Sequence, residues 1–308
     1  MSELSYRVPN GIGVAIIAPG GYAEDQVAYE HGIARLEAMG CRVKSYYDPA
    51  AKFQRFGGTD EARAAQIHAA FRDPDVKIVM ALRGGYGCSR LLNMIDYDAL
   101  AASGKMFVGH SDLTALQLAL LAKTGAPSFS GPMICPDFTR DEISGFTTYH
   151  FWQCVANPSH KISVQAAGNP VVDVSGKMWG GNLSMLAHLL GTEYFPSVEG
   201  GILCLEDISE HPYRVERMMI ELIHAGVLEK QRAVVLGDFS GYKLNDYDNG
   251  YDFDSMVGYL RSSLKVPVLT GLPLGHIRDK VTLAVGCNAK LASRSDGFDL
   301  SMSGHPTL

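Results

Sequence analysis

Short apolar runs alternate with helix-like segments through the first half of the chain, and this alternation constrains the fold more than any other feature. Runs with the length and composition of buried strands lie at residues 14–18, 42–46, 77–82 and 105–108. Segments with helical spacing separate or follow them, at residues 24–39, 59–70, 90–95 and 112–123. Strands separated by helices predict βαβ units and a parallel sheet, and hence an α/β protein.

The pattern changes after Gly131. Residues 136–169 are largely polar, contain one helical pattern and are typical of a connecting segment. Beyond them, strand patterns at 201–205, 233–236 and 281–283 mix with helix patterns at 183–190, 212–225 and 255–264. A length of 308 residues suits about two domains. We therefore predict a first domain over residues 1–135 and a second over residues 170–308.

Charge and hydropathy disfavour two classes of partner. The net charge is −6 and the chain has no run of Lys or Arg, whereas proteins that bind nucleic acid carry a basic face. The longest apolar stretches, 12–18 and 115–122, are far shorter than the ~20 residues of a membrane-spanning helix. The first stretch ends in Pro-Gly-Gly, which favours a buried strand over a signal peptide. We expect no nucleic-acid partner and no membrane association.

The cysteines bear on the cellular compartment of the protein, and the glycines bear on its backbone conformation. The six cysteines are scattered without a C-x-x-C pair, which indicates reduced and mostly buried thiols of a cytoplasmic protein. The chain has 33 glycines in 308 residues, about 11% against roughly 7% in average proteins. This excess predicts many tight turns and close backbone approaches.

The common phosphate, calcium and zinc motifs are incomplete. The loop from Gly84 to Arg90 matches neither the dinucleotide fingerprint nor the phosphate loop. The acidic segment 246–254 has its glycine at the fifth position of a calcium loop instead of the sixth, and Val257 at the twelfth. The histidines have no H-E-x-x-H motif or other paired ligand spacing. We expect no metal and no cofactor.

Ser111 occupies the most informative position in the sequence. It follows the apolar run 105–108 and Gly109, and it directly precedes a helical pattern, so it lies at a sharp strand-to-helix junction. Such a junction exposes a serine at the carboxyl edge of a parallel sheet, where ligands of open α/β sheets bind. The helix N-terminal amides also point at that edge. The motif departs from a regular nucleophile elbow because Leu113 replaces the second glycine. Ser111 could instead simply cap the helix.

A nucleophilic serine needs a base and a group that orients the base. His110 adjoins Ser111, but neighbouring side chains diverge at such a turn, so we do not expect it to be the base. Glu206 ends an apolar run and His276 lies in a Gly/Pro-rich loop, which suits both to such a site. On the sequence alone the structural roles are favoured, a surface acid or helix cap for Glu206 and an exposed loop histidine for His276, since most such residues are structural.

Two glycine-rich turns are expected at the same edge. The run 77–82 leads into Arg83-Gly84-Gly85, which should lie beside Ser111 if the two strands are neighbours. Glycines there let backbone N–H groups reach a substrate carbonyl, and the N–H of Asp112 would be a second donor to an oxyanion. A plain turn is the alternative.

Several segments, in order from about residue 17 to 306, resemble the LD-carboxypeptidases. These muramoyltetrapeptide carboxypeptidases are serine peptidases of murein recycling, and the microcin C immunity peptidases belong to the same superfamily. The segments are Arg-Gly-Gly-Tyr-Gly at 83–87, Gly-His-Ser-Asp at 109–112, Trp-Gly-Gly-Asn-Leu at 179–183, Leu-Glu-Asp at 205–207, Glu-His-Pro-Tyr-Arg-Val-Glu-Arg at 210–217 and Gly-His at 275–276.

The resemblance implies a fold and a catalytic site. The fold would be an N-terminal α/β domain with a Rossmann-like parallel sheet and a smaller, β-rich α/β C-terminal domain, with the site between them. The catalytic residues would be Ser111 as nucleophile, His276 as base and Glu206 as the orienting acid. The backbone N–H groups of Gly85 and Asp112 would form the oxyanion hole.

The resemblance also implies a cytoplasmic homodimer that removes the terminal D-alanine from the murein tetrapeptide L-Ala–D-Glu–meso-diaminopimelate–D-Ala or from other muropeptides. Arg83 is a candidate for binding the terminal carboxylate, or else part of a structural ion pair. Trp179 and Asn182 are candidates for lining the substrate cleft. Two alternatives remain open: a microcin-type immunity peptidase with the same triad, and a catalytically inactive muropeptide-binding protein.

Overall fold

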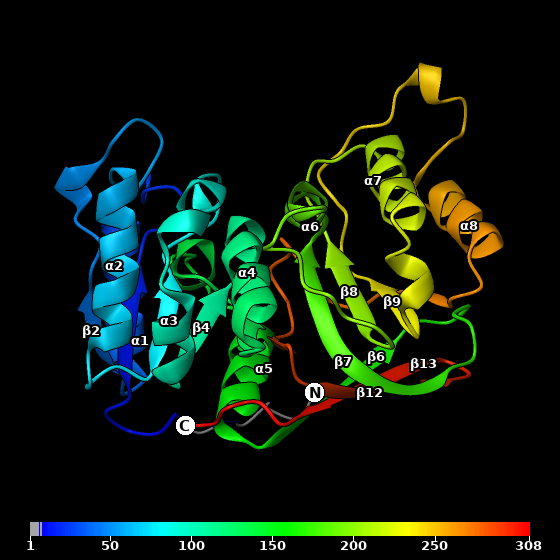
Figure 1. The fold of residues 1–308 in the computed structure, drawn as a ribbon. Helices are drawn as coiled ribbons and strands as arrows, with labels where there is room; N and C mark the ends of the chain where they lie inside the picture. Colours follow the sequence, from blue (N-terminus) through cyan, green and yellow to red (C-terminus); the bar gives the residue numbers. More distant parts are fainter. Residues whose placement is uncertain (1–5, 7) are drawn as a thin grey trace.

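The computed structural model describes Tyr6 and residues 8–308, which form two β-sheets flanked by helices (Figure 1). The first sheet has six strands in the order β11-β5-β4-β3-β1-β2. They are β1 (Gly13–Ile17), β2 (Arg42–Ser45), β3 (Ile78–Ala81), β4 (Met106–Gly109), β5 (Ser128–Ser130) and β11 (Leu283–Val285). All pair in parallel except β11, which is antiparallel to β5. The order of β1 to β5 is that of a doubly wound sheet, as predicted.

The α-helices of the first half are α1 (Gln26–Ala38), α2 (Asp60–Arg72), α3 (Tyr97–Ala102), α4 (Thr114–Thr124) and α5 (Gly145–Ala156). Helices α1, α2 and α4 match predicted segments, whereas the segment predicted at 90–95 lies in a 3₁₀ helix, Cys88–Met94, and α3 was not predicted. The side chains of Asp25 and Thr59 accept hydrogen bonds from first-turn N–H groups of α1 and α2. Gly125, with φ of 73°, ends α4 in the left-handed conformation that glycine adopts readily.

The second sheet has seven strands in the order β10-β9-β8-β7-β12-β13-β6. They are β6 (Ser159–Gln165), β7 (Asp173–Asn182), β8 (Ile202–Glu206), β9 (Ala233–Leu236), β10 (Val268–Thr270), β12 (Asn288–Arg294) and β13 (Gly297–Ser303). Strands β7 to β10 pair in parallel, whereas β7, β12, β13 and β6 pair antiparallel. The accompanying helices are α6 (Leu183–Leu189), α7 (Pro212–His224) and α8 (Phe253–Ser263). The predicted α/β class is confirmed.

Two strands lie across the predicted domain boundaries. β6 comes from the expected connecting segment, 136–169, yet it is an edge strand of the second sheet. β11 comes from the range expected for the second domain, yet it completes the first sheet. The division at 135 and 170 therefore stays a prediction, and residues 1–5 and 7 of the first range lie outside the described part.

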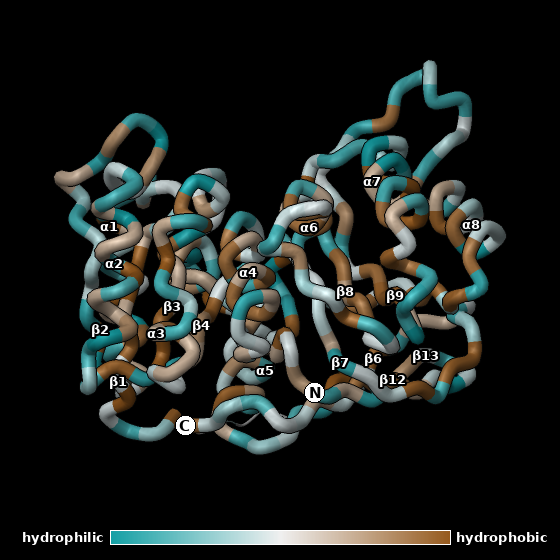
Figure 2. Tube along the Cα trace, in the orientation of Figure 1, coloured by the Kyte–Doolittle hydropathy of each residue, from teal (hydrophilic) through white to brown (hydrophobic). Residues whose placement is uncertain are grey.

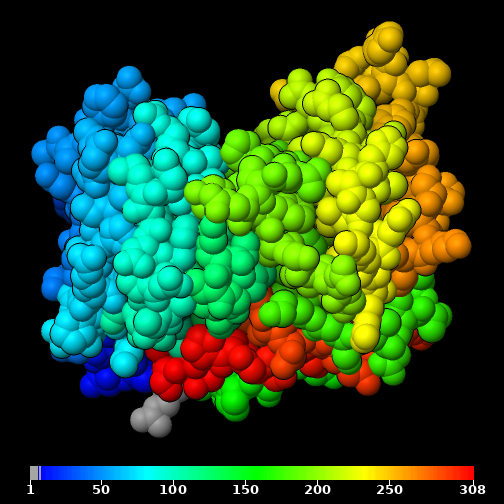
Figure 3. Space-filling view, viewed as in Figure 1, coloured from blue at the N-terminus to red at the C-terminus, as the bar shows by residue number. Residues whose placement is uncertain are grey.

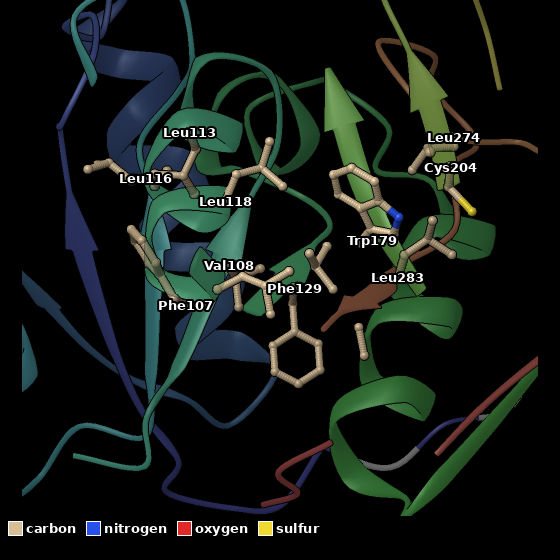
Figure 4. Close-up of a cluster of buried hydrophobic side chains, with 14 of the residues drawn as sticks. Phe107, Val108, Leu113, Leu116, Leu118, Phe129, Trp179, Cys204, Leu274 and Leu283 are labelled. Atoms are coloured by element: carbon tan, nitrogen blue, oxygen red, sulfur yellow. The ribbon is translucent and has the colours of Figure 1, made fainter. Parts of the chain in front are cut away.

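One buried core runs through both sheets. Figure 2 shows hydrophobic colour along β8 and β9, and Figure 4 shows buried side chains continuing from β4 and α4 to Trp179 and Cys204 of the second sheet. Helix α4 lies between the two halves and contacts both α6 and β7. Within residues 6 and 8–308, the helices are all too short or too polar to cross a bilayer.

Candidate active site

Ser111 lies at the carboxyl edge of the first sheet, just after strand β4. β4 ends at Gly109, a 3₁₀ turn begins at Ser111, and α4 follows directly. The backbone φ of Ser111 is +62°, a left-handed conformation that few residues other than glycine adopt. Backbone strain of this kind is characteristic of functional sites and of the nucleophile turn of α/β hydrolases. The sequence predicted the sharp junction, and the structure has it.

A cavity of about 510 Å³ opens at Ser111. Its walls come from both halves of the chain, because Gly84, Gly85 and Ser111 follow strands of the first sheet whereas Ile208 and His276 follow strands of the second. Figure 3 shows a notch at the upper edge, between the halves. Ser111 and His276 therefore line one cavity although they are far apart in the sequence.

Glu206 holds the ring of His276. The Nδ1 atom of His276 lies 2.8 Å from Oε2 of Glu206, whose side chain is only 1% exposed. This contact occupies Nδ1 and leaves Nε2 as the nitrogen available to another group. Gly275 permits the close approach: with φ of 127°, a Cβ built there would meet Glu206 Oε2 at 3.0 Å.

Asn182 lies behind Glu206 and not in the cavity. Its Nδ2 donates to Oε1 of Glu206 at 3.2 Å and to Oδ1 of Asp207 at 3.0 Å. Asp207 in turn accepts the backbone N–H of Ser184 at 2.8 Å. Asn182 was expected to line the substrate cleft, but it is buried and orients a carboxylate. Its place at the end of β7, paired with Glu206 at the end of β8, explains this contact.

The glycine-rich turn after β3 packs directly on Ser111. A Cβ at Gly84 would lie 2.7 Å from the Cβ and Oγ of Ser111, so only glycine fits. The same Cβ would lie 3.4 Å from the backbone nitrogen of Asp112, which places that nitrogen beside the turn. Gly85, with φ of 103°, lines the cavity. The two turns expected at one sheet edge are thus in contact.

Arg63 supports this turn, although the helical spacing of residues 59–70 predicts an outward position for it on α2. Its side chain is fully buried, and its guanidinium donates to the backbone carbonyls of Pro19 and Gly87. It also pairs with Asp60 and lies over the ring of Phe56. The prediction was wrong because the spacing of residues along one helix gives no information about carbonyl groups that other loops bring next to it.

His110 is a buried neighbour of the site. Its Nδ1 lies 2.9 Å from the carbonyl oxygen of Gly131, and its ring meets that of His276 edge-on at 5.1 Å. Burial lowers the pKa of His110 well below its usual value, and the nearby charges of Lys280 and His276 act in the same direction. The side chain is therefore neutral near pH 7.

Arg83 and Trp179 differ in their relation to the cavity. Arg83 lines it and pairs with Glu24, whose pKa is lowered by the hydrogen bond from Arg83. Trp179 does not reach it, because the indole is fully buried in the hydrophobic cluster of Figure 4. The indole donates to Oε1 of Gln231 at 2.9 Å and meets the Phe195 ring edge-on. The structure thus supplies no contact between Trp179 and the cavity at Ser111.

The loop that carries His276 is fastened to the connecting segment by residues that the sequence did not single out. Lys280 Nζ lies 2.8 Å from Asp137 Oδ1, and both side chains are buried. Thr147 donates to the carbonyl of Arg278 at 2.8 Å and accepts the N–H of Lys280 at 2.9 Å. These partners are more than 130 residues apart in sequence, so no local pattern could have revealed them.

The described residues contain no group of three or more His, Cys, Asp or Glu side chains arranged to hold a metal ion. The acidic segment 246–254 is likewise without such a group. Its carboxylates serve local roles instead: Asp248 accepts the backbone N–H of Asn245 at 2.7 Å, and Asp252 caps α8.

Comparisons with known proteins point in one direction. The LD-carboxypeptidase N-terminal domain family matches residues 14–131, and the LD-carboxypeptidase C-terminal domain family matches residues 175–291. The chain is 30% identical over 274 residues to the murein tetrapeptide carboxypeptidase of Pseudomonas aeruginosa, covering 85% of this chain and 87% of the relative. It is 29% identical over 282 residues to the microcin C7 self-immunity protein MccF of Escherichia coli, covering 80% and 79%.

A solved structure extends the similarity to three dimensions. The crystal structure of muramoyltetrapeptide carboxypeptidase from Oxalobacter formigenes superimposes with a TM-score of 0.92 at 53% identity. The alignment covers 96% of this chain and 100% of that one, so both halves and their arrangement are shared.

Proposed function

The chain belongs to the LD-carboxypeptidase family of serine peptidases, and on this premise we propose that it releases the terminal D-alanine from the murein tetrapeptide L-Ala–D-Glu–meso-diaminopimelate–D-Ala. One observation carries the proposal: Ser111, held at a φ of +62°, lines the same cavity as His276, whose Nδ1 contacts the buried Glu206. A strained serine, an imidazole and an orienting carboxylate are the parts of an acyl-transfer site.

In the proposed mechanism, Ser111 Oγ attacks the carbonyl carbon of diaminopimelate while His276 Nε2 takes the hydroxyl proton. The negative charge on the carbonyl oxygen is held by the backbone N–H groups of Gly85 and Asp112. His276 then gives its proton to the amine of D-alanine, which leaves, and an acyl ester remains on Ser111. Water repeats the attack with His276 as base and releases the tripeptide.

Glu206 has an electrostatic and an orienting task in this scheme. The Nδ1–H of His276 donates to Oε2 of Glu206, which fixes the tautomer with Nε2 facing the reaction and stabilises the imidazolium that forms. Asn182 holds the second carboxylate oxygen, Oε1, and so limits rotation of the carboxylate. Because Ser111 follows a strand of the first sheet whereas Glu206 ends a strand of the second and His276 follows another, the site depends on the contact between the halves.

We also propose that the enzyme is a cytoplasmic homodimer that acts on recycled muropeptides. All six cysteines are free thiols, which supports a reducing compartment. The homodimer rests on the resemblance to the family.

The direct test is D-alanine release by the purified protein. Tetrapeptide and pentapeptide are supplied separately, with and without a metal chelator, to the wild type and to Ser111→Ala. Release from the tetrapeptide alone, unaffected by chelator and lost in Ser111→Ala, is the expected result. Release that needs a metal, or full activity without the Ser111 hydroxyl, would contradict the proposed mechanism.

A second candidate is an amide hydrolase of the microcin-immunity type, favoured by the 29% identity to MccF. The same purified protein distinguishes the two when it is offered a peptidyl or acyl-sulfamoyl nucleotide beside the tetrapeptide. A higher kcat/KM on the nucleotide would favour the immunity activity. Binding of muropeptide without turnover of either substrate would indicate an inactive muropeptide-binding protein.

A further inference from the structure

A second, smaller cavity adjoins the one at Ser111. It measures about 240 Å³ and shares Glu24, Arg83 and Gly85 with its larger neighbour. Its remaining walls include Tyr22, Tyr86 and Arg55. Since Gly85 borders both cavities, a substrate whose carbonyl is held at Gly85 has room for a side chain in the second cavity.

Arg55 brings an unpaired positive charge to this cavity. The adjacent Phe56 is buried, and its backbone pairs with that of Phe53, so the loop that carries Arg55 is anchored. The guanidinium carbon lies 5.9 Å from the centre of the Tyr86 ring. Across residues 6 and 8–308 no carboxylate forms an ion pair with Arg55, whereas the nearby Arg83 does have such a partner.

Glu24 brings a negative charge to the same cavity. One of its oxygens, Oε1, accepts from Arg83, yet the side chain is 75% exposed and can accept a further donor. The cavity therefore presents an accessible carboxylate and an unpaired guanidinium. This combination matches a group that bears an ammonium and a carboxylate on one carbon, the free end of an α-amino acid.

Resting on the proposed function, we propose that this cavity binds the distal amino-acid centre of the diaminopimelate side chain, with Arg55 on its carboxylate and Glu24 on its ammonium. That side chain belongs to the residue whose carbonyl Ser111 attacks, so it starts beside Gly85. Its methylene groups then pass Tyr22 and Tyr86, and its end reaches the two charges. Arg55 is accordingly a specificity residue that favours diaminopimelate over lysine, which has the ammonium and lacks the carboxylate.

The test compares two tetrapeptides that differ only at the third residue, meso-diaminopimelate or L-lysine. In the wild type, kcat/KM should be about 10- to 100-fold higher for the diaminopimelate peptide, the value expected for one charge-assisted contact. Arg55→Ala should lower the ratio of the two kcat/KM values by the same factor. Glu24→Gln should lower kcat/KM for both peptides, because both carry the distal ammonium.

Lys52→Ala is the matched control, because it removes a neighbouring cation of the same loop that lies over Tyr22 and does not line the cavity. It should leave the ratio of the two kcat/KM values at its wild-type value. The assignment of Arg55 is overturned if Arg55→Ala slows both peptides equally, if Lys52→Ala lowers the ratio as much, or if the wild type does not discriminate. A wild-type kcat/KM for the lysine peptide more than about a thousandfold below that for the diaminopimelate peptide also contradicts the assignment, because one contact cannot supply that selectivity. D-alanine release from neither peptide would instead overturn the proposed function itself.

Discussion

Asp112 links the turn that carries Ser111 to the glycine-rich turn beside it. Its buried Oδ2 accepts the backbone N–H of Cys88 at 2.9 Å, and burial raises the pKa of this carboxyl. The residue thus joins, through its side chain, the two segments that we propose supply the oxyanion donors Gly85 and Asp112. At the scale of single residues, this contact ties the end of the glycine-rich turn to the residue that follows Ser111.

Asp112→Ala should therefore lower kcat about 10- to 100-fold with little change in KM, somewhat less than the loss of an oxyanion donor itself. The reason is that the N–H of Cys88 loses its acceptor and the glycine turn is no longer held against Ser111. Steady-state kinetics of D-alanine release measure the effect. Asp98→Ala, at an exposed position of α3, is the control. If Asp112→Ala retains the wild-type kcat, the Asp112 side chain does not position the oxyanion donors.

Residue positions were predictable from the sequence where the backbone pattern alone determines them. Ser111 follows the buried strand β4, Glu206 ends the buried strand β8 and His276 lies in a Gly/Pro loop, so the sequence pattern made each a candidate, whereas their joint role rests on the resemblance to the family. Trp179 and Asn182 were assigned to the cleft, and the structure buries both because β7 is covered by neighbours distant in sequence. The direction of a side chain on a central strand depends on those neighbours, which a single sequence does not reveal.

At the scale of elements, α5 holds the loop that carries His276. Thr147→Val keeps the shape of the side chain but removes the donor to the Arg278 carbonyl and the acceptor for the Lys280 N–H. Because the buried N–H of Lys280 and the partly buried carbonyl of Arg278 would each lose a partner, we expect a loss of about 1–3 kcal/mol in the free energy of unfolding. A several-fold fall in kcat/KM should accompany it as the His276 loop loosens.

Thr148→Val gives the matched comparison for α5, because the Thr148 hydroxyl donates only within its own helix, to the carbonyls of Ser144 and Gly145. Urea unfolding and D-alanine release are measured on both variants. Thr148→Val should retain wild-type kcat/KM. Equal kinetics in the two variants would show that the contact from Thr147 to the loop does not position the base.

A histidine pair joins α5 to β6 and makes stability depend on pH. His150 Nδ1 lies 2.9 Å from His160 Nε2, and burial lowers the pKa of each to about 4. His305, which lies near the pair, holds the carbonyl of Cys154 at the end of α5. Below pH about 6.5, which is the ordinary pKa of histidine, these two side chains take up protons in the unfolded chain but stay neutral in the folded one. The folded state therefore loses stability as the pH drops from about 6.5 toward 4.

We expect the free energy of unfolding to decrease by about 2–4 kcal/mol between pH 7 and pH 5 because of this pair. Urea midpoints measured at both pH values test the estimate. The double variant His150→Gln, His160→Gln should flatten this dependence, whereas His31→Gln, at an exposed position of α1, should not. If the free energy of unfolding of the double variant depends on pH as in the wild type, the dependence comes from other groups.

The elements themselves were predictable to different degrees. Strands β1, β3 and β4 are wholly buried and read as continuous apolar runs, so they were found. β6 alternates exposed and buried residues in Ser-His-Lys-Ile-Ser-Val-Gln, and it was interpreted as part of a polar connection. β12 was missed for a related reason, because its outward positions are polar and its partners β7 and β13 are known only from the fold.

At the scale of the whole molecule, the two halves meet at a point where no extra atom fits. Gly181, near the end of β7, has φ of +132°, and a Cβ built there would lie 2.8 Å from Oγ1 of Thr114. Thr114 begins α4, three residues after Ser111, and its Oγ1 also accepts the N–H of Asn182 at 3.2 Å. The segment that orients Glu206 is therefore packed directly on the helix that follows the proposed nucleophile.

Gly181→Ala should separate these two segments and affect stability and catalysis together. We expect a loss of about 2–5 kcal/mol in the free energy of unfolding, from the clash with Thr114 and the strained φ. The kcat/KM of the folded variant should fall at least about tenfold, because small displacements between reacting groups are costly.

Gly191→Ala is the control that separates the clash from the backbone strain: Gly191 also has a positive φ, of +81°, but its Cβ would meet no atom within 4 Å. It should cost only about 1–2 kcal/mol and leave kcat/KM unchanged. If both variants lose equal stability and keep wild-type activity, the contact between Gly181 and Thr114 does not set the geometry of the site.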